Sequence, residues 1–224
     1  MKLNVTIDDK KVQAKQGQTI LEAAQANGIE IPTLCQHKDL EPIGACRICV
    51  VEVQGAKGLT ASCCTPVGDG MIISTNSEKV KKARRVVINL ILSSHAHNCV
   101  VCSTANVCEL QKLAADCDIG KSRYKNRKRY YQQEDVSPYV FRDLSKCIMC
   151  YRCVAACKNI KKVNIYAVSY RGFDSKITVD LDEVINKDEC KDCEVCIKVC
   201  PVGALLKPEK RFGKKHDTPF YIKG

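Results

Sequence analysis

The sequence predicts an α+β protein whose strands and helices follow one another in successive parts of the chain. Residues 1–76 contain short segments of alternating apolar and polar side chains around one helical segment. Residues 77–95 carry apolar side chains at helical spacing. The C-terminal part contains one cysteine pattern twice, over residues 147–157 and 190–200. Together these features indicate a small sheet, a helical part and a repeated cysteine-rich unit.

The composition points to metal binding in a reducing compartment. The 224 residues include 17 cysteines, with 36 Lys and Arg against 25 Asp and Glu, for a formal net charge of +11. The N-terminal MKLNVTIDDKKV lacks the apolar stretch of a signal peptide. The longest apolar run, Val86–Leu92, is far shorter than a membrane span. We therefore expect a cytoplasmic protein with no membrane span, in which clustered cysteines bind metal.

The first 76 residues predict a sheet crossed by one helix. A short helix is expected in GQTILEAAQANG, with Thr19 as its N-cap and Gly28 just past its end. Strand-like segments flank this helix on both sides: Leu3–Ile7, VQA at residues 12–14, Ile48–Val53 and Met71–Ile73. The turn-like DDKK between the first two segments predicts a hairpin.

A longer helix is predicted over residues 77–95, SEKVKKARRVVINLILSSH. Its apolar side chains recur at the three- and four-residue intervals of a buried helix face. Ser77 is a suitable N-cap, and Glu78 favours the positive start of the helix. His95 therefore lies just past the helix end. A second helix is predicted from about residue 107 to residue 115.

Two further segments have a distinctive composition. KSRYKNRKRYY, residues 121–131, interleaves basic and aromatic side chains, as some nucleic-acid-binding segments do. No RNA-binding signature accompanies it, so we interpret it as a solvated linker and expect no nucleic-acid partner. VNIYAVSYRGFDSKITVD predicts a hairpin around Arg171 and Gly172. The basic tail after residue 208 is expected to be extended.

The two C-terminal runs, CIMCYRCVAAC and CKDCEVCIKVCP, share the spacing C-x2-C-x2-C-x3-C of two-cluster bacterial ferredoxins. In those proteins the fourth cysteine of each run binds the other cluster. The rule predicts two [4Fe–4S] clusters with crossed ligand sets: Cys147, Cys150, Cys153 and Cys200 for one, and Cys190, Cys193, Cys196 and Cys157 for the other. We expect the fourth cysteine of each run to begin a helix. Zinc is the alternative, but structural zinc sites use four ligands each, whereas these runs interlock.

A third set has the spacing C-x10-C-x2-C-x13-C and comprises Cys35, Cys46, Cys49 and Cys63. It keeps the C-x2-C core and the remote fourth ligand of plant-type [2Fe–2S] ferredoxins, but its first gap is longer. The strand-rich setting suits a β-grasp-like ferredoxin. Cys64 competes with Cys63 for the fourth position. Gly44 lies where the backbone must pass close to sulfide, and we interpret His37 as a surface residue.

The last set reads H-x3-C-x2-C-x5-C and comprises His95, Cys99, Cys102 and Cys108. Spacing alone fits a zinc ion or a [4Fe–4S] cluster about equally. Three other iron–sulfur motifs in the same chain favour the cluster. His97 is a rival ligand, but a single residue separates it from Cys99 and leaves little room to reach back, so we favour His95. A neutral imidazole in place of a thiolate removes one negative charge, which should raise the reduction potential.

These sets use 15 of the 17 cysteines and leave Cys64 and Cys117, which we interpret as buried small apolar residues. The clusters also change the charge balance. An oxidised all-cysteine cluster carries about −2 and one with a histidine ligand about −1, which reduces the net charge to about +4. The basic excess then largely neutralises the clusters, and little of it remains to attract an acidic partner.

Taken in order, these motifs closely resemble the N-terminal iron–sulfur portion of the large subunit of complex I-type NADH dehydrogenases. The matching segments are IPTLC, GACRICVVEV, ASCCTPV, H-x3-C-x2-C-x5-CELQ, RDLSKCIMCYRC and CPVGAL. A similar portion forms the stand-alone small diaphorase subunit of NAD-reducing hydrogenases. It also recurs in electron-bifurcating hydrogenases and NAD-dependent formate dehydrogenases. The resemblance covers roughly residues 1–208, and it supports Cys63 over Cys64 and His95 over His97.

The resemblance also implies an architecture and a set of cofactors. The cofactors would be one [2Fe–2S] cluster and three [4Fe–4S] clusters, one of them held by a histidine and three cysteines. The expected parts are a β-grasp [2Fe–2S] ferredoxin domain (1–76), a small helical domain with the histidine-ligated cluster (77–120), a basic linker (121–138), a bacterial two-[4Fe–4S] ferredoxin-like domain (139–208) and a C-terminal tail (209–224).

The function implied is that of an electron-transfer subunit in a multisubunit NAD(P)H-dependent oxidoreductase, of a type that includes electron-bifurcating complexes. It would relay electrons between a flavin-containing NAD(P)H-oxidising subunit and a further redox subunit or soluble ferredoxin. The sequence shows no catalytic triad, phosphate loop or G-x-G-x-x-G, so we expect no substrate site on this chain alone. Two alternatives are a fragment of a catalytic hydrogenase or formate dehydrogenase chain, and a zinc-based nucleic-acid-binding module.

Overall fold

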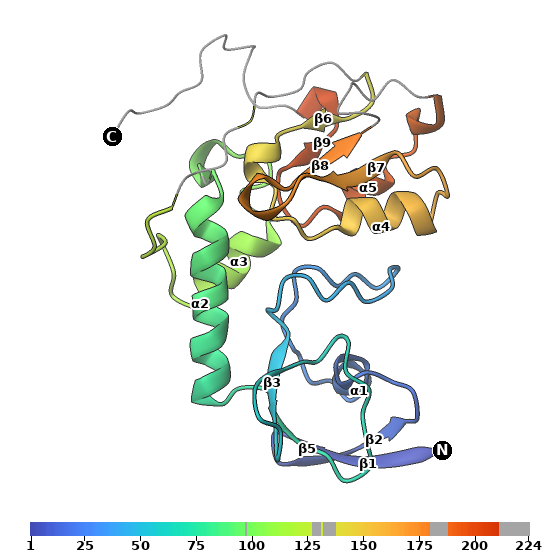
Figure 1. Cartoon of the computed structure of the whole chain (residues 1–224), viewed down its shortest axis with the longest axis vertical. Coiled ribbons are helices and arrows are strands. Elements are labelled where there is room, and N and C mark those ends of the chain that lie inside the picture. The colour runs from blue at the N-terminus through green and yellow to red at the C-terminus, as the bar shows by residue number, and fades with distance from the viewer. Residues whose placement is uncertain (97, 127–130, 132–137, 180–187, 211–224) are drawn as a thin grey trace.

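The computed structural model describes residues 1–96, 98–126, 131, 138–179 and 188–210. A sheet formed by the N-terminal residues lies at one end of the molecule, and the cysteine-rich C-terminal region lies at the other (Figure 1). The long helix α2 (Glu78–Ser94) runs between them. Residues 127–130 of the basic segment and residues 211–224 of the tail lie outside the described residues, so the expectations of a solvated linker and an extended arm stay predictions.

The N-terminal part is a mixed sheet with the strand order β2–β1–β5–β3–β4. The strands are β1 (Lys2–Ile7), β2 (Lys10–Lys15), β3 (Val50–Val53), β4 (Thr60–Ala61) and β5 (Ile72–Ser74). β1 and β2 form an antiparallel hairpin, whereas β1 and β5 are parallel. The predicted sheet with a helix across it is confirmed. The two-residue strand β4 was not predicted.

The helix α1 (Ile20–Ala26) begins and ends where the sequence predicts. The Thr19 side chain accepts a hydrogen bond from the Glu22 N–H (3.2 Å), and the Thr19 N–H donates to the Glu22 carboxylate (2.7 Å). This capping box satisfies backbone donors that the first turn would otherwise leave without partners. Gly28 ends the helix with a φ of +69°. The buried face of α1 contributes Ile20, Leu21 and two alanines to the core of the sheet.

The helix α2 is fixed to the sheet by a cap and by a buried arginine. Ser77 is its N-cap, as predicted, and accepts a hydrogen bond from the Val80 N–H (3.3 Å). Arg84 is buried and donates to the carbonyls of Ile48 (3.1 Å) and Val50 (3.0 Å). A second helix, α3 (Glu109–Asp116), packs beside α2 and begins two residues later than predicted. Within the described ranges, no helix combines the length and apolar character needed to cross a membrane.

The C-terminal region packs two helices against short strands. Its elements are β6 (Phe141–Arg142), α4 (Arg152–Asn159), β7 (Tyr166–Ser169), β8 (Lys176–Val179), α5 (Val195–Val199) and β9 (Leu205–Leu206). β7 and β8 form the predicted antiparallel hairpin around residues 171–172. The short pair of β6 and β9 was not predicted. Helices α4 and α5 lie against each other beneath this hairpin (Figure 1).

The expectation that the fourth cysteine of each run begins a helix is wrong. Helix α4 begins at Arg152, before Cys153, and contains Cys157 within it. Cys200 is the C-cap of α5. The reason lies in the residues that precede each helix: Tyr151 and Glu194 adopt left-handed conformations with φ of 63° and 51°. These residues end the ligand turn, so the helix starts before the third cysteine.

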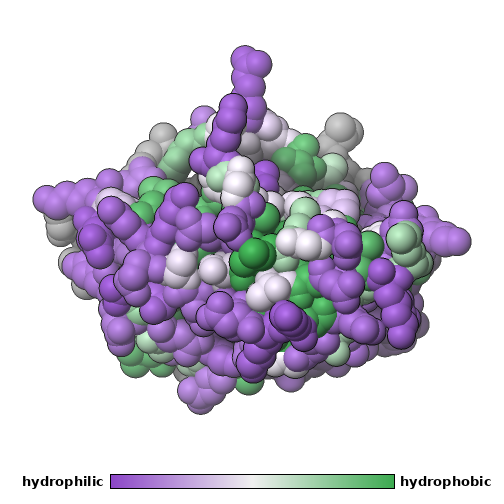
Figure 2. Space-filling model, turned by 90° about the horizontal axis from the view of Figure 1, so that it is seen from below, coloured by the Kyte–Doolittle hydropathy of each residue, from purple (hydrophilic) through white to green (hydrophobic). Residues whose placement is uncertain are grey.

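The loop between α1 and β3 reaches towards the C-terminal region (Figure 1). Leu40 in this loop packs with Ala156 of α4 and Val199 of α5. Leu34 and Ile48 pack with apolar residues of α2, α3 and the segment after Cys200. Figure 2 shows the molecule from below, from the end that carries the N-terminal sheet. This face is mostly hydrophilic, with a small apolar area near its middle.

Candidate metal centres

The first cysteine set is brought together beside the N-terminal sheet. The Cys46 N–H donates to Cys35 Sγ (3.4 Å), and the sulfurs of Cys49 and Cys63 are 3.3 Å apart. Hydrogen bonding with Cys46 lowers the pKa of Cys35 to about 6, and hydrogen bonding with Cys63 lowers the pKa of Cys49 to about 6, while the same pairings raise the pKa values of Cys46 and Cys63. Two thiolates therefore form readily in this set, and thiolates are the form that binds metal.

The backbone around this set adopts conformations that suit a close approach to sulfur. Arg47, between the paired cysteines, has a φ of 60°, and Gly44 has a φ of +67°. A Cβ at position 44 would lie 2.8 Å from Cys64 Sγ. The interpretation of Cys64 as buried is wrong: its side chain is exposed and its sulfur lies 3.5 Å from Cys63 Sγ. Cys63, by contrast, is buried and belongs to the core of the sheet.

The second set lies at the end of α2 and before α3. His95 is buried and is the C-cap of α2, so its position at the helix end agrees with the sequence, and its N–H donates to the Ile91 carbonyl (3.1 Å). Cys99 is exposed, while Cys102 and Cys108 are half-buried. Burial raises the pKa of Cys108, and the nearby thiols of Cys102 and Cys99 raise it further. Cys99 and Cys102 therefore lie near enough to Cys108 to affect its charge. His97 lies outside the described residues.

The segment after Cys200 covers this second set. The Glu109 N–H donates to the Pro201 carbonyl (3.0 Å). A Cβ at Gly203 would lie 3.0 Å from Cys102 Sγ and 2.7 Å from Thr104 Oγ1. Only glycine fits this position without displacing the loop of the second set. The second set and the segment that follows Cys200 therefore lie side by side.

The third set surrounds a cavity. Cys147, Cys150 and Cys153 line it together with Cys200, which is 47 residues further along the chain than Cys153. The cavity has a volume of about 430 Å³, including the part that is open to solvent, and its other walls are mainly apolar. Burial raises the pKa of Cys150 to about 12 and that of Cys153 well above its usual value. Thiolates at this site therefore require a compensating positive charge.

The fourth set includes residues of both α4 and α5. Burial raises the pKa of Cys196 to about 11; a hydrogen bond from Tyr166 opposes this effect, while the nearby thiols of Cys193 and Cys190 add to it. Cys157 belongs to the same apolar cluster and accepts a hydrogen bond at its sulfur from the Ile165 N–H (3.3 Å).

The two C-terminal runs share an unusual backbone pattern. Met149 and Tyr151 have positive φ values of 53° and 63°, and the corresponding Asp192 and Glu194 have values of 56° and 51°. Non-glycine residues rarely adopt this conformation, and where they do the site is commonly functional. Turns that alternate right- and left-handed residues direct successive N–H groups into an anion-binding concavity, as found around iron–sulfur clusters. Soft thiols, apolar walls and such turns together fit an iron–sulfur cluster.

Across the described part of the chain, no three histidine, cysteine or carboxylate side chains are arranged to hold a single metal ion. His37, which we interpreted as a surface residue, is half-buried, and its Nδ1 accepts a hydrogen bond from the N–H of exposed Asp39 (3.3 Å). Cys117 is half-buried at the end of α3, so its interpretation as a buried residue is wrong.

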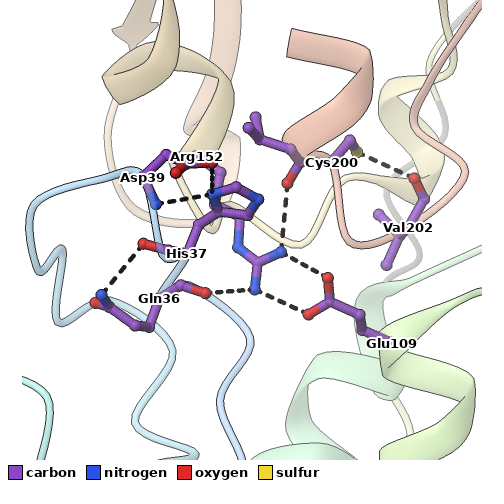
Figure 3. A network of polar contacts seen from close by, with 8 residues as sticks. Gln36, His37, Asp39, Glu109, Arg152, Cys200 and Val202 are labelled. Atoms are coloured by element: carbon purple, nitrogen blue, oxygen red, sulfur yellow. Dashed lines mark hydrogen bonds and ion pairs between the residues drawn. The ribbon is translucent and has the colours of Figure 1, made fainter. Parts of the chain in front are cut away.

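Sequence reasoning missed Arg152, which lies inside a ligand run. Its side chain is 3 % exposed and forms a bidentate ion pair with Glu109 (2.7 and 2.8 Å). The guanidinium also donates to the carbonyls of Gln36 (2.7 Å) and Val199 (3.4 Å), as Figure 3 shows. The signal available in the sequence was a basic residue between two clustered cysteines, where positive charge would oppose that of a cluster.

Comparison with known families divides the chain into three matches. Residues 1–78 match the 2Fe-2S iron–sulfur cluster binding domain. Residues 84–123 match the NADH-ubiquinone oxidoreductase-G iron–sulfur binding region, and residues 137–206 match the ferredoxin-like domain of NADH-quinone oxidoreductase subunit 3. These matches do not favour the zinc-based nucleic-acid module.

Several individual proteins are similar over almost the whole chain. The NADP-reducing hydrogenase subunit HndD of Solidesulfovibrio fructosivorans is 39% identical over 92% of this chain. The NADH-ubiquinone oxidoreductase 75 kDa subunit of Reclinomonas americana is 36% identical over 91%. The chain spans only 36% and 29% of these two relatives. A chain of a crystal structure of NAD+-reducing [NiFe]-hydrogenase in the H2-reduced state superposes with a TM-score of 0.81 at 30% identity, covering 91% of this chain and 86% of that one.

Proposed function

Since this chain belongs to the family of iron–sulfur proteins that includes the 75 kDa subunit of NADH-ubiquinone oxidoreductase, we propose that it relays single electrons between other subunits of an oxidoreductase complex. The chain would act as an electron-transfer subunit of an NADH-quinone oxidoreductase or of an NAD(P)-reducing hydrogenase. When bound, its clusters accept and release electrons one at a time. The residues of the chain itself bind these clusters, shield them from water and set the charge around them.

The strongest support is the cavity lined by cysteines that are distant in sequence. Cys147, Cys150 and Cys153 meet Cys200, and not Cys157, around one space. This is the crossed arrangement expected for two interlocked clusters, and a chain of two independent zinc sites has no need of it.

The proposed cofactors are one [2Fe–2S] cluster and three [4Fe–4S] clusters. The proposed ligand sets are Cys35, Cys46, Cys49 and Cys63 for the [2Fe–2S] cluster; His95, Cys99, Cys102 and Cys108; Cys147, Cys150, Cys153 and Cys200; and Cys190, Cys193, Cys196 and Cys157. We also propose the division into parts at residues 76, 120, 138 and 208. The packing of the β1–β5 sheet, of α2 with α3, and of α4 with α5 supports it.

The partners we propose are a flavin-containing NAD(P)H-oxidising subunit and a further redox subunit or soluble ferredoxin. The names of the relatives, a subunit of NADH-ubiquinone oxidoreductase and a subunit of an NADP-reducing hydrogenase, support partners of this kind. We propose a cytoplasmic location, because clustered thiols keep their metal in a reducing compartment. Purifying the native complex without oxygen and identifying its subunits would test these partners directly.

The cluster content can be tested on the purified chain. We expect anaerobically isolated protein to contain about 14 iron atoms and about as many acid-labile sulfides. Reduction by dithionite should bleach the visible absorption and produce the EPR signals of reduced clusters. A fully metallated protein that contains zinc and no sulfide would contradict the proposal. So would turnover of hydrogen or formate by the chain alone, which would support the catalytic alternative.

Substitution of single cysteines tests the ligand sets. Cys200→Ser should remove or alter the EPR signal of one [4Fe–4S] cluster and lower the iron content by up to about four atoms. Cys117→Ser is the matched control, since Cys117 belongs to none of the proposed sets, and it should keep the full content. Equal content and unchanged spectra in both variants would show that Cys200 is not a ligand.

The histidine ligand has its own pair of variants. His95→Ala should abolish or alter the signal of the cluster with Cys99, Cys102 and Cys108, whereas His97→Ala should leave it unchanged. The buried position of His95 at the end of α2 supports this order. The reverse result would assign the ligand to His97.

A further inference from the structure

Arg152 occupies a position shared by three parts of the molecule. It is the first residue of α4, lies between Cys150 and Cys153, and its side chain is almost completely buried. Its guanidinium reaches the loop after α1, the first turn of α3 and the end of α5 (Figure 3). These three segments come from the N-terminal, central and C-terminal parts of the chain, so a single side chain joins all three.

Each residue that the guanidinium contacts is next to a proposed ligand. Gln36 follows Cys35, Glu109 follows Cys108, and Val199 precedes Cys200. Arg152 therefore contacts the ligand segments of three different centres. Because Gln36 is contacted through its backbone carbonyl at 2.7 Å, a change at Arg152 acts directly on the main chain beside Cys35.

We propose that Arg152, with Glu109 as its counter-ion, is a positioning residue that fixes the ligand segments of three centres relative to one another and raises the reduction potentials of the adjacent clusters. This inference rests on the proposed function, because it concerns clusters bound at these cysteines. A cluster becomes more negative when it is reduced. A nearby positive charge favours that state and a nearby negative charge opposes it; the effect is stronger for the buried Arg152 than for Glu109, whose side chain is 43% exposed.

The geometry requires an arginine. A planar guanidinium can bind a carboxylate through two parallel hydrogen bonds and still donate to two carbonyls, as this one does. A lysine ammonium carries the same charge but is a compact donor on a flexible stem. Lysine at position 152 should therefore preserve most of the charge effect and lose the fixed geometry.

The test compares four variants of the full chain, each isolated without oxygen and checked for iron and sulfide: R152Q, R152K, E109Q and R85Q. The first readout is the midpoint potential of each cluster in an EPR-monitored redox titration. The second is hydrogen exchange of the peptide that contains Gln36. R85Q is the matched control, because Arg85 also pairs with a carboxylate, Asp118 at 3.5 Å, but on the surface between α2 and α3.

We expect R152Q to shift the potentials of the clusters nearest to it in the negative direction and E109Q to shift them in the positive direction. R152K should keep potentials close to those of the parent protein but show the faster exchange around Gln36 that R152Q shows. R85Q should change neither readout. Potential shifts of opposite sign in R152Q and E109Q would indicate an electrostatic effect. A loss of packing alone would shift the potentials of both variants in the same direction.

The inference is overturned if R152Q and E109Q shift the potentials in the same direction, or if neither changes potentials or exchange. If R152Q fails to assemble its clusters, E109Q still shows the direction of the potential shift, and R152K still shows the change in hydrogen exchange around Gln36. Failure of the proposed function looks different: the unsubstituted chain would then contain no iron and sulfide at all.

Discussion

Tyr166 is a buried residue placed between two of the proposed centres. Its ring lines the cavity of Cys147, Cys150, Cys153 and Cys200, and its hydroxyl donates to Cys196 Sγ at 3.5 Å. Burial raises the pKa of Tyr166 well above its usual value, so the hydroxyl stays protonated and remains a donor at any physiological pH. Hydrogen bonds to cluster sulfurs are one of the means by which proteins set reduction potentials.

We therefore expect Tyr166→Phe to shift the potential of the cluster bound by Cys196 in the negative direction, because a donor to its sulfur is lost while the ring is kept. EPR-monitored redox titration measures the shift. Tyr170→Phe removes a hydroxyl from an exposed tyrosine in the same hairpin region and serves as the control. A midpoint potential in the Tyr166 variant equal to that of the control would contradict a role for this hydrogen bond.

Gly44 combines a left-handed backbone with a close neighbour, and the two effects can be separated. Gly44→Ala should destabilise the protein by about 1–2 kcal/mol from the positive φ alone, and by more because its Cβ would lie 2.8 Å from Cys64 Sγ. Gly55 also has a positive φ but faces open space, so Gly55→Ala should show the backbone part only.

The thermal midpoint of the metallated protein, measured without oxygen, provides the comparison. Combining Gly44→Ala with Cys64→Ala should restore the midpoint to that of Gly55→Ala, because the contact is then removed. If the double variant is no more stable than Gly44→Ala alone, Cys64 is not the residue that requires glycine at position 44.

At the scale of single elements, local signals predicted the longer helices and tertiary contacts decided the rest. The caps at Thr19 and Ser77 and the spacing of apolar residues fixed α1 and α2 to within one residue of their observed bounds. The two-residue strands β4, β6 and β9 are too short to show an alternation. β4 pairs with the nearby β3, whereas β6 and β9 pair although they are distant in sequence. The start of α4 was missed because left-handed backbone at Tyr151 carries no glycine signal.

In the candidate site too, local patterns could be predicted from the sequence, whereas contacts between distant segments could not. The cysteine spacing predicted that Cys147, Cys150 and Cys153 group with Cys200, and these four line one cavity, whereas the other ligand sets stay predictions. The exposure of Cys64 and the contacts of Arg152 could not be read from the sequence. The contacts of Arg152 depend on how the loop after α1 packs against α4, over a separation of 116 residues.

The N-cap of α2 offers a test of how the sheet is joined to the central helix. Ser77→Ala should lower the free energy of unfolding by about 1 kcal/mol, because the hydroxyl accepts from the Val80 N–H at the helix start. The same hydroxyl donates to the Glu52 carboxylate on β3 (2.7 Å). We expect faster hydrogen exchange in the first turn of α2 than in the parent protein.

Ser94→Ala is the control at the other end of the same helix, where the hydroxyl bonds only to the Ile91 carbonyl (3.3 Å). We expect Ser94→Ala to lower the free energy of unfolding less than Ser77→Ala does, because the Ser94 hydroxyl does not cap the helix. Equal losses of stability in the two variants would show that the Ser77 hydroxyl does not act as a cap.

At the scale of the whole molecule, the two ends differ in what their cores contain. The core of the N-terminal sheet is built mainly from aliphatic side chains of β1, α1 and β5, and it also contains Cys49 and Cys63. The C-terminal core includes buried Cys153, Cys157 and Cys196, and further proposed ligands pack against it. Cluster binding should therefore contribute more to folding at the C-terminal end, where metal and core coincide.

Removing the clusters should consequently unfold the molecule unevenly. We expect protein stripped of iron under anaerobic, reducing conditions to lose hydrogen-exchange protection in α4, α5 and the β7–β8 hairpin, while β1, β2 and α1 keep most of theirs. Loss of the anionic clusters also returns the charge towards the formal +11, which adds repulsion among basic residues. Cys200→Ser tests the same idea without chelator, and it should weaken protection in α4 and α5 more than in β1. Equal loss of protection in β1 and α4 would mean that the chain folds as one cooperative unit. The aliphatic core of the sheet would then be unstable without the metal centres.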